Sequence, residues 1–397
     1  MKPLSEIVAK TEASATLVLT ALAKRLQADG VDVVSLTAGE PDFPTPQHIK
    51  DAAKRAIEEN RTTYTLNAGT LELRQAIVQK FRADNNLAFH PSQILVSNGA
   101  KHSIANALQA ICNRGDEVIV PSPYWVSYPQ MVLLAGATPV IVSTSEENGF
   151  MLTAEQLRGA ITARTKALIL CTPSNPTGAI YSKHDLELLA EVIAETGIYV
   201  IADEIYEKMI YDGAHHFSIG SIASIRNQVV TVNGMSKAYS MTGWRVGFLG
   251  ASQEIASGAE RVQSQTTSNA SSISQYAALA ALTGPQDEIV AMAEEYDRRR
   301  EFIHSAVTSI PGIRCHMPKG AFYIFPNISD YLGRSVRGVT MNSCDDIAKF
   351  LLDEEGVALV PGSSFGSENH LRISYSCSIT ELEKAAERLQ RGFRKLE

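Results

Sequence analysis

The middle of the chain alternates short runs of apolar, β-branched residues with longer stretches that have helical periodicity. One such stretch, His184–Thr196, has an apolar side formed by Leu186, Leu188, Leu189 and Val192. Several apolar runs are continuous rather than alternating, which is typical of strands buried on both faces. The predicted strands are Ile94–Ser97, Glu117–Val120, Pro139–Ser143, Ala167–Cys171, Tyr199–Ala202, Val229–Val232 and Arg245–Leu249. This alternation predicts a mostly parallel sheet wrapped by helices, with ligands at the carboxyl ends of the strands.

The pattern changes after about residue 285. A charged helix over Asp287–Val307 is followed by separated strands and by a closing helix over Ile379–Leu396. The strands expected here are Ile313–Cys315, Gly320–Phe325, Val357–Val360 and His370–Ser374. We therefore predict a second, smaller α+β domain over residues 286–397. No long glycine- and serine-rich linker separates the two parts, so a rigid connection is expected.

Composition and charge exclude several classes of protein. The 397 residues carry a formal net charge of −7, which argues against a nucleic-acid surface or a polybasic membrane surface. No apolar run approaches the ~20 residues of a membrane span, and the N-terminus has no apolar signal core, so we expect a cytoplasmic protein. The five cysteines are scattered singly and the nine histidines lack metal-ligand spacing. Neither a disulfide framework nor a metal site is expected.

Two common nucleotide-binding motifs are missing from the sequence. No GxGxxG follows the early predicted strands, and no GxxxxGK[ST] occurs anywhere. The crevice of the predicted α/β sheet therefore requires another ligand.

Two segments that follow predicted strands contain candidate binding groups. The first runs from Val96 through Gly99 to Lys101 and into a helix, whose N-terminus would offer free N–H groups to a phosphate. The second, Cys171–Gly178, holds the amide of Asn175 between two prolines, which fixes the backbone around a potential hydrogen-bond donor. Each segment taken alone also fits an ordinary turn.

Charged side chains follow the next two predicted strands. Asp203 ends an apolar strand, with Tyr206 three residues later; a buried carboxylate requires a positive or donor partner, and helix capping is the alternative. Lys237 follows another apolar strand, where a desolvated lysine has a lowered pKa and can form a Schiff base. Arg245 would supply a fixed charge for a phosphate. For either basic residue alone, an ordinary surface charge is the alternative.

Considered together, these residues match the chemistry of one cofactor. Pyridoxal phosphate has a phosphate group, an aldehyde that condenses with lysine, a phenolic oxygen, and a ring nitrogen that requires a carboxylate. The sequence offers a partner for each of these groups, and the partners follow one another across successive predicted strand ends. They are Gly99, Asn175, Asp203, Lys237 and Arg245. This ordered set is far more specific than any one of its members.

Motifs along essentially the whole chain point to a family. They are Ala38–Phe43, Pro173–Gly178, Asp203–Tyr206, Ser236-Lys237 and Leu371–Tyr375. With them the sequence resembles the class I, fold-type I pyridoxal-phosphate aminotransferases, within the Iβ branch that includes bacterial and plastid aspartate aminotransferases. The resemblance implies a large cofactor-binding domain over residues 46–285 with a mostly parallel seven-stranded sheet. It also implies a smaller domain over residues 286–397, and an N-terminal segment over residues 1–45 that joins this smaller domain. The family resemblance further implies a homodimer.

The resemblance implies a role for each cofactor-binding residue. Lys237 would carry the cofactor and shuttle the α-proton of the substrate, while Asp203 would pair with the ring nitrogen. Asn175 and Tyr206 would hydrogen-bond the phenolic oxygen. Trp125 would lie over the ring face, with a core aromatic residue as the alternative. The phosphate would be held by Gly99, Ala100, Ser236, Arg245 and, from the neighbouring subunit, Tyr64.

The resemblance also implies how the substrate is held. Arg372 would bind the α-carboxylate through two of its guanidinium nitrogens, helped by the Gly39 backbone. Lys101 would bind the second carboxylate, a task that an arginine performs in animal-type enzymes. Thr16 matches a position that joins this lysine in prephenate-using members, with a helix-capping threonine as the alternative. We therefore expect aspartate, glutamate and oxaloacetate as substrates, with prephenate as a further candidate; the predicted substrate contacts also include Trp125 and Asn175.

Two rival functions are considered. An alanine or aromatic aminotransferase, a carbon–sulfur lyase or a cyclopropane-forming synthase would share the same cofactor and α-carboxylate residues. A regulator with an aminotransferase-like domain would require an added DNA-binding module or a basic face. A purely structural role would leave Lys237 and Asp203 unexplained.

Overall fold

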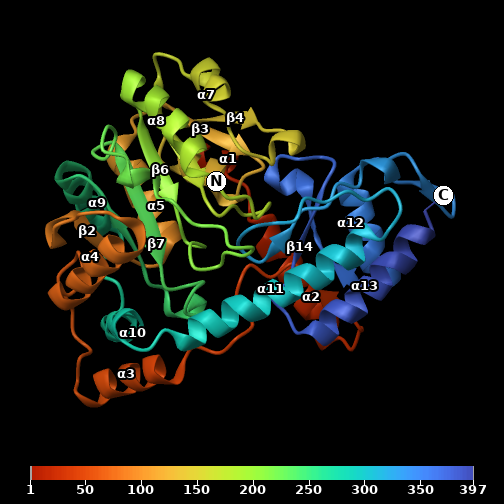
Figure 1. The fold of residues 1–397 in the computed structure, drawn as a ribbon, viewed down its shortest axis with the longest axis horizontal. Coiled ribbons are helices and arrows are strands. Elements are labelled where there is room, and N and C mark those ends of the chain that lie inside the picture. Colours follow the sequence, from red (N-terminus) through yellow and green to blue (C-terminus); the bar gives the residue numbers. More distant parts are fainter. Residues whose placement is uncertain (1, 397) are drawn as a thin grey trace.

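A seven-stranded sheet forms the centre of the larger part of the computed structural model, which describes residues 2–396 (Figure 1). Its strand order is β2-β8-β7-β6-β5-β3-β4. The five strands β3 to β7 all run in parallel, whereas β8 runs antiparallel to both of its neighbours, β7 and β2. The predicted mostly parallel sheet is therefore confirmed. The strands are β2 (Ile94–Ser97), β3 (Glu117–Ser122), β4 (Thr138–Ser143), β5 (Thr165–Cys171), β6 (Tyr199–Asp203), β7 (Val229–Gly234) and β8 (Gly247–Gly250).

Helices cover both faces of this sheet, which explains the continuous apolar runs in the sequence. In β5, Ala167 and Ile169 face one cluster with α5, α6 and α9, while Leu168 and Leu170 face another with α7 and α8. A third cluster joins α3, α4 and α10 to the β2–β8 edge. These helices are α3 (Gln47–Glu58), α4 (Leu71–Asn85), α5 (Ala100–Ile111), α6 (Ser127–Leu134), α7 (Ala154–Ala160), α8 (Lys183–Thr196), α9 (Gln253–Thr266) and α10 (Ser272–Thr283).

The C-terminal part has its own core around a three-stranded antiparallel sheet of order β13-β14-β9. The long helix α11 (Asp287–Thr308) runs from the large sheet into this part (Figure 1). The other elements are β9 (Tyr323–Ile324), β10 (Ser335–Val336), β11 (Val339–Thr340), α12 (Cys344–Glu355), β12 (Val357–Ala358), β13 (Val360–Pro361), β14 (Leu371–Ser374) and α13 (Ile379–Arg394).

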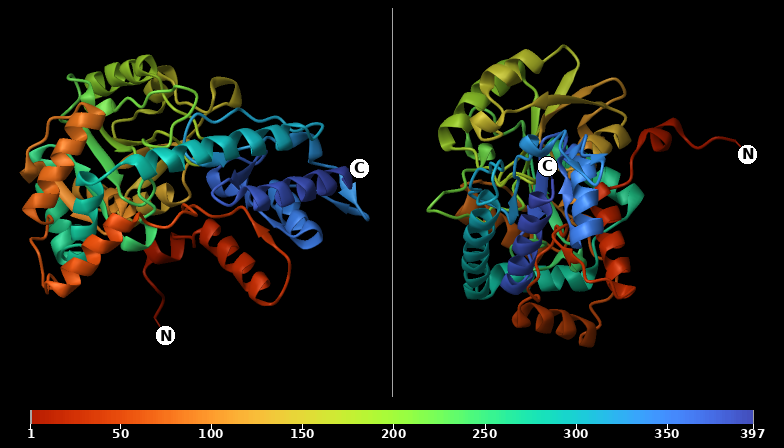
Figure 2. Two further views of the ribbon diagram at one scale, coloured as in Figure 1. Left: turned by 60° about the horizontal axis from the view of Figure 1, so that its bottom comes forward. Right: turned by 90° about the vertical axis from the view of Figure 1, so that its right-hand side faces the viewer.

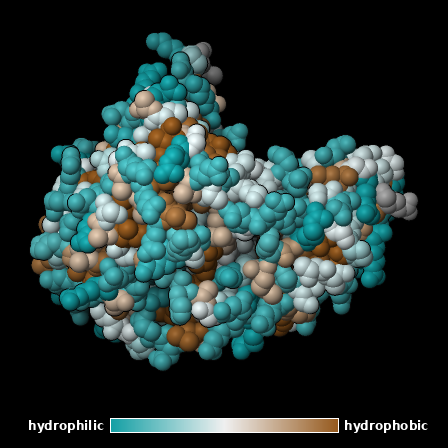
Figure 3. Space-filling view, turned by 45° about the horizontal axis from the view of Figure 1, so that its top comes forward, coloured by the Kyte–Doolittle hydropathy of each residue, from teal (hydrophilic) through white to brown (hydrophobic). Residues whose placement is uncertain are grey.

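The N-terminal segment lies against the C-terminal part. Strand β1 (Val34–Ser35) pairs in parallel with β12, and α2 (Ala15–Ala28) packs beside it. Helix α1 (Glu6–Lys10) projects away from the body of the molecule in both turned ribbon views (Figure 2). The space-filling view shows a mostly hydrophilic face with apolar side chains in small separate groups (Figure 3). The pairing agrees with an N-terminal segment that joins the smaller domain, although the boundaries 1–45, 46–285 and 286–397 stay predictions.

Four predicted strands differ from the structure, and one of them, Gly320–Phe325, is reduced to β9 (Tyr323–Ile324). Ile313–Cys315 forms no strand and makes only one isolated bridge, from Arg314 to Asn327, because prolines at 311 and 318 limit the extended segment. Val357–Val360 is divided at Leu359 into β12 and β13, which pair with different partners. The strand expected from Arg245 begins at Gly247, because Arg245 has a left-handed φ of +55°.

Within residues 2–396, no helix has the length and apolar character needed to cross a bilayer. The five cysteines are all free thiols in the structure.

Candidate active site

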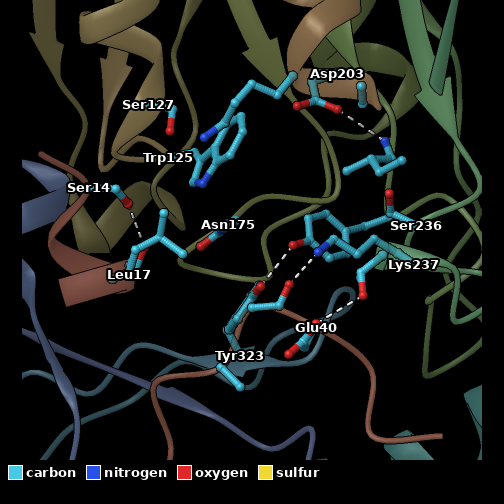
Figure 4. A pocket seen from close by; sticks show the side chains of 18 of the residues that line it. Ser14, Leu17, Glu40, Trp125, Ser127, Asn175, Asp203, Ser236, Lys237 and Tyr323 are labelled. Carbon is cyan, nitrogen blue, oxygen red and sulfur yellow. Dashed lines mark hydrogen bonds between the residues drawn. The ribbon is translucent and has the colours of Figure 1, made fainter. Parts of the chain in front are cut away.

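A cavity of about 330 Å³ lies at the carboxyl ends of β5, β6 and β7, and residues of the N- and C-terminal parts line its other side (Figure 4). Most of the predicted site residues line it. They are Thr16, Gly39, Ala100, Lys101, Trp125, Asn175, Asp203, Tyr206, Ser236, Lys237, Arg245 and Arg372. Gly99 directly precedes Ala100, at the N-cap of α5. Tyr64 does not line the cavity of its own chain and is 90% exposed.

The amine of Lys237 points into the cavity and donates a hydrogen bond to the carbonyl of Gly39 (Figure 4). Burial lowers the pKa of Lys237 to about 8, and the positive charges of Arg372 and Arg245 add to this shift, against the opposing charges of Glu40 and Asp203. Near neutral pH, a larger fraction of this side chain is therefore uncharged than for a lysine in water. An uncharged amine is the form that attacks carbonyl groups and accepts protons.

The carboxylate of Asp203 is buried at the end of β6 and is held from two sides. Its Oδ2 accepts a hydrogen bond of 2.7 Å from the hydroxyl of Tyr128, and its Oδ1 accepts one of 3.3 Å from the backbone N–H of Ile205. Burial raises the pKa of Asp203 to about 6, while the Tyr128 hydrogen bond lowers it. No α-helix begins at Asp203, so the helix-capping alternative is not supported.

Replacing Tyr128 should shift the pH dependence of the enzyme. In Tyr128→Phe the ionised form of Asp203 loses a donor, so the pKa of Asp203 rises further and the acid limb of the pH–rate profile moves upward by about one unit. The profile is measured for the amino-acid half-reaction that the sequence resemblance implies, at saturating pyridoxal phosphate. Tyr331→Phe, in which the lost hydroxyl contacts the Pro311 carbonyl outside the cavity, serves as the matched control. An acid limb that stays in place in Tyr128→Phe would contradict this role.

The start of α5 brings positive charge and free N–H groups to one end of the cavity. Gly99 has a φ of +88°, and the N–H of Ala100, at the first helical position, has no partner within the helix. The guanidinium of Arg245 donates to the carbonyls of Asn98 (3.2 Å) and Thr242 (2.8 Å). A Cβ at position 99 would overlap this guanidinium, so glycine allows the charge to approach the helix start. Together these groups suit a phosphate.

Arg372 is buried at the other end of the cavity without a carboxylate partner among residues 2–396. Its Nη2 donates to the Thr37 carbonyl (2.7 Å) and its Nη1 to Asn175 Oδ1 (3.1 Å), while its Nε has no hydrogen-bond partner within the described chain. Burial lowers the pKa of Arg372, but a guanidinium keeps its charge in proteins. A buried, uncompensated cation of this kind calls for an anionic ligand such as a carboxylate.

Side chains from α5, α6 and α2 form the wall beside these charged groups. The ammonium of Lys101 lies 4.8 Å from the centre of the Trp125 ring, which packs edge-on against Tyr128. Trp125 is half-buried and lines the cavity, so it is more than a core aromatic residue. The N-cap of α2 is Ser14, not Thr16, whose hydroxyl lies 3.0 Å from that of Ser14. The capping alternative for Thr16 is therefore not supported.

Residues 31–389 match the family described as aminotransferase class I and II, and the chain belongs to this family. It is 46% identical to the aspartate aminotransferase of Bacillus subtilis over 98% of both chains. It is also 45% identical to the aspartate/prephenate aminotransferase of Cereibacter sphaeroides, again over 98% of both chains. The crystal structure of the aspartate aminotransferase from Rhizobium meliloti matches 100% of both chains with a TM-score of 0.97 and 40% identity. These findings confirm the family and the fold predicted from the motifs.

Several residues that line the cavity were not predicted from the sequence, and among them Tyr128, Tyr323 and Thr37 form hydrogen bonds with predicted site residues. Tyr128 follows the predicted site residue Trp125 by three residues, which is a helical spacing. This spacing is the one feature of the sequence that could have indicated that Tyr128 also faces the site. Tyr323 lies within a predicted strand, and Thr37 contributes a backbone carbonyl to Arg372. Neither position carries a local pattern that distinguishes it from a core residue.

Proposed function

We propose that this enzyme transfers the amino group of L-aspartate or L-glutamate to 2-oxo acids, with pyridoxal 5′-phosphate as cofactor. The family is an aminotransferase family, and relatives at 43–46% identity over nearly the full chain are named aspartate or aspartate/prephenate aminotransferases. The observation that carries the proposal is one cavity that holds a lysine of lowered pKa, a buried aspartate and a buried arginine that has no acidic partner among residues 2–396.

The residues of the cavity fit pyridoxal phosphate. The start of α5 with Ser236 and Arg245 would bind the phosphate, Asp203 the ring nitrogen, and Asn175 with Tyr206 the phenolic oxygen. The bound cofactor supplies an aldehyde that condenses with amines and a ring that withdraws electrons from the substrate α-carbon. Trp125 would cover one face of the ring and exclude water from it.

Lys237 acts on the proton at the α-carbon of the amino acid. As a neutral amine it takes this proton and holds it within the cavity. Because the pKa of Lys237 is lowered, the protonated amine gives the proton up again readily. Asp203, kept ionised by Tyr128, would pair with the ring nitrogen of the cofactor and keep that nitrogen protonated. In this way Asp203 maintains the positive charge on the ring that draws electrons away from the α-carbon. Arg372 binds the α-carboxylate with a two-pronged geometry that a lysine would not reproduce.

Lys101 supports a substrate with a second carboxylate. Its ammonium lies over Trp125 at the open side of the cavity, and burial lowers its pKa, which favours a compensating anion. Thr16 lines the same wall, and we propose that it assists Lys101 when prephenate is the acceptor, as the resemblance to prephenate-using members suggests.

A homodimer would complete the site and cover exposed apolar surface. Tyr64 is 90% exposed and Leu66 63% exposed on the same loop, and Leu4 is 77% exposed near α1. We propose that a second copy covers these side chains and that Tyr64 reaches the phosphate of its partner's site. Residues 1–45 and 286–397 would form one unit that closes over bound substrate, and we propose a cytoplasmic location.

A half-reaction tests this function and separates it from its rivals. The enzyme is converted to its amine form with glutamate, and the return of the cofactor absorbance is followed with oxaloacetate, pyruvate or prephenate. We expect fast return with oxaloacetate. Return with prephenate as well would make the enzyme an aspartate/prephenate aminotransferase, and return with pyruvate alone would favour an alanine aminotransferase. No amine form with any donor would contradict the proposed function.

Lys101→Met should weaken dicarboxylate binding selectively. A charge-assisted hydrogen bond to a carboxylate is lost, so the concentration of oxaloacetate for half-maximal rate should rise roughly 10- to 100-fold. Pyruvate, which has no second carboxylate, is the matched control and should react as it does with the unchanged enzyme. Equal losses for both acceptors would assign Lys101 to another role.

A further inference from the structure

Tyr323 connects two parts of the site that are otherwise separate. It lies on β9, is fully buried, and its hydroxyl lies 2.8 Å from the hydroxyl of Tyr206 (Figure 4). The ring of the same residue covers the guanidinium of Arg372, at 4.5 Å from the ring centre. One side chain from the C-terminal part thus contacts both the predicted phenol-binding tyrosine and the carboxylate-binding arginine.

We propose that Tyr323 is a positioning residue that donates its hydroxyl hydrogen to Tyr206 and thereby directs the Tyr206 hydrogen toward the phenolic oxygen of the cofactor. The inference rests on the proposed function, because it requires that Tyr206 faces that oxygen. It assigns to Tyr323 a hydrogen-bond role that the sequence pattern of a buried strand did not indicate.

The direction of the Tyr206–Tyr323 hydrogen bond follows from counting donors. Each phenol has one hydrogen to donate, and in the chain alone either oxygen can act as the donor. Once Tyr206 donates to the phenolic oxygen of the cofactor, its oxygen is left only as an acceptor toward Tyr323. The hydroxyl of Tyr323 has no other hydrogen-bond partner among residues 2–396, so it donates to Tyr206.

The surroundings indicate that the hydroxyl, and not only the ring, is required at position 323. The ring packs against Phe322, with centroids 4.7 Å apart, so a phenylalanine would fill the same apolar space. Burying a hydroxyl without a partner costs free energy, and within the described residues this hydroxyl has its hydrogen-bond partner in Tyr206 alone. The hydroxyl is enclosed on its other side by the backbone at Gly39, where an added Cβ would approach it to 3.3 Å.

Both phenols remain protonated in this environment. Burial raises the pKa of Tyr206 well above its ordinary value and also raises that of Tyr323. Two hydrogen bonds in series, each polarising the next, make Tyr206 a stronger donor than it would be alone. A stronger donor draws negative charge from the phenolic oxygen of the cofactor, and this lowers the proton affinity of the Lys237 nitrogen near it.

The test is a spectrophotometric pH titration of the cofactor bound to the full-length enzyme. In Tyr323→Phe the pKa read from the absorbance should rise by roughly 0.2–0.6 unit, because Tyr206 loses its donor. The ring over Arg372 is kept in this variant. In a Tyr206→Phe background, the same replacement at 323 should shift the pKa by less than about 0.1 unit, since the effect passes through the Tyr206 hydroxyl.

The matched control is Tyr375→Phe, which removes a buried hydroxyl that donates to the Ala321 carbonyl (3.0 Å), outside the cavity. An unchanged or lower pKa in Tyr323→Phe, or an equal shift with and without Tyr206, would overturn the inference while leaving the proposed function in place. A wild-type protein that shows no absorbance of bound pyridoxal phosphate would instead overturn the proposed function itself.

Discussion

Lys237→Ala should lose turnover by roughly 10⁴-fold or more while it still binds pyridoxal phosphate. The lost amine is the one whose pKa burial lowers to about 8, and within the described chain Lys101 is the one other lysine that lines the cavity. Cofactor binding should persist because Asp203, Arg245 and the start of α5 remain. Activity with aspartate and 2-oxoglutarate, and the absorbance of the bound cofactor, are measured in parallel.

The control for this replacement is Lys183→Ala on α8, where the side chain is 64% exposed, forms an ion pair with Glu187 and lies outside the cavity. This variant removes a lysine side chain from the surface instead of from the cavity, and it should leave turnover unchanged. Near-normal activity in Lys237→Ala would show that proton transfer at the α-carbon uses another group, and the proposed role of Lys237 would be wrong.

Asp203→Ala should lower the rate of the amino-acid half-reaction by about 10³-fold, with the fold intact. The carboxylate is buried and positioned by Tyr128 and by the backbone N–H of Ile205. Without its charge, the ring nitrogen of the cofactor loses the group that keeps it protonated. The rate is measured in a single turnover at saturating cofactor, so that weaker cofactor binding does not enter the result.

A second variant separates the charge of Asp203 from its hydrogen bonds. Asp203→Ala leaves the Tyr128 hydroxyl buried without its acceptor, which costs about 1–3 kcal/mol of stability. Asp203→Asn keeps an oxygen acceptor for Tyr128 but removes the charge, so it should be slow yet stable. A half-reaction in Asp203→Asn as fast as in the unchanged enzyme would reject the electrostatic role.

The sequence predicted the fold because the strands of the large sheet are buried on both faces and therefore read as continuous apolar runs. Ala167–Cys171 and Val229–Val232 both lie within observed strands. Short strands of the C-terminal part were harder to predict, because pairing decides their limits. Leu359 has the same apolar character as its neighbours, yet the chain changes pairing partner there, from β1 to β14.

The site was predictable where one residue type is unusual at its position. Lys237 and Asp203 stand at the ends of apolar strands, and Asn175 lies between prolines. Tyr128 and Tyr323 are ordinary residues in their local sequence, and only the folded chain brings their hydroxyls to Asp203 and Tyr206. Arg245 was expected within a strand, and its left-handed backbone turns the guanidinium toward the start of α5.

The pairing of β1 with β12 has a consequence for the order in which the molecule assembles. Val34 and Val357 are direct partners, although they are more than 300 residues apart in the chain. As the protein is synthesised from its N-terminus, the large sheet, which ends at Gly250, can form while β1 still waits for its partner strand. The hydrogen bond from Arg372 to the Thr37 carbonyl can therefore form only after β14 has emerged. The end of the cavity that would bind the substrate carboxylate is thus completed after the large sheet.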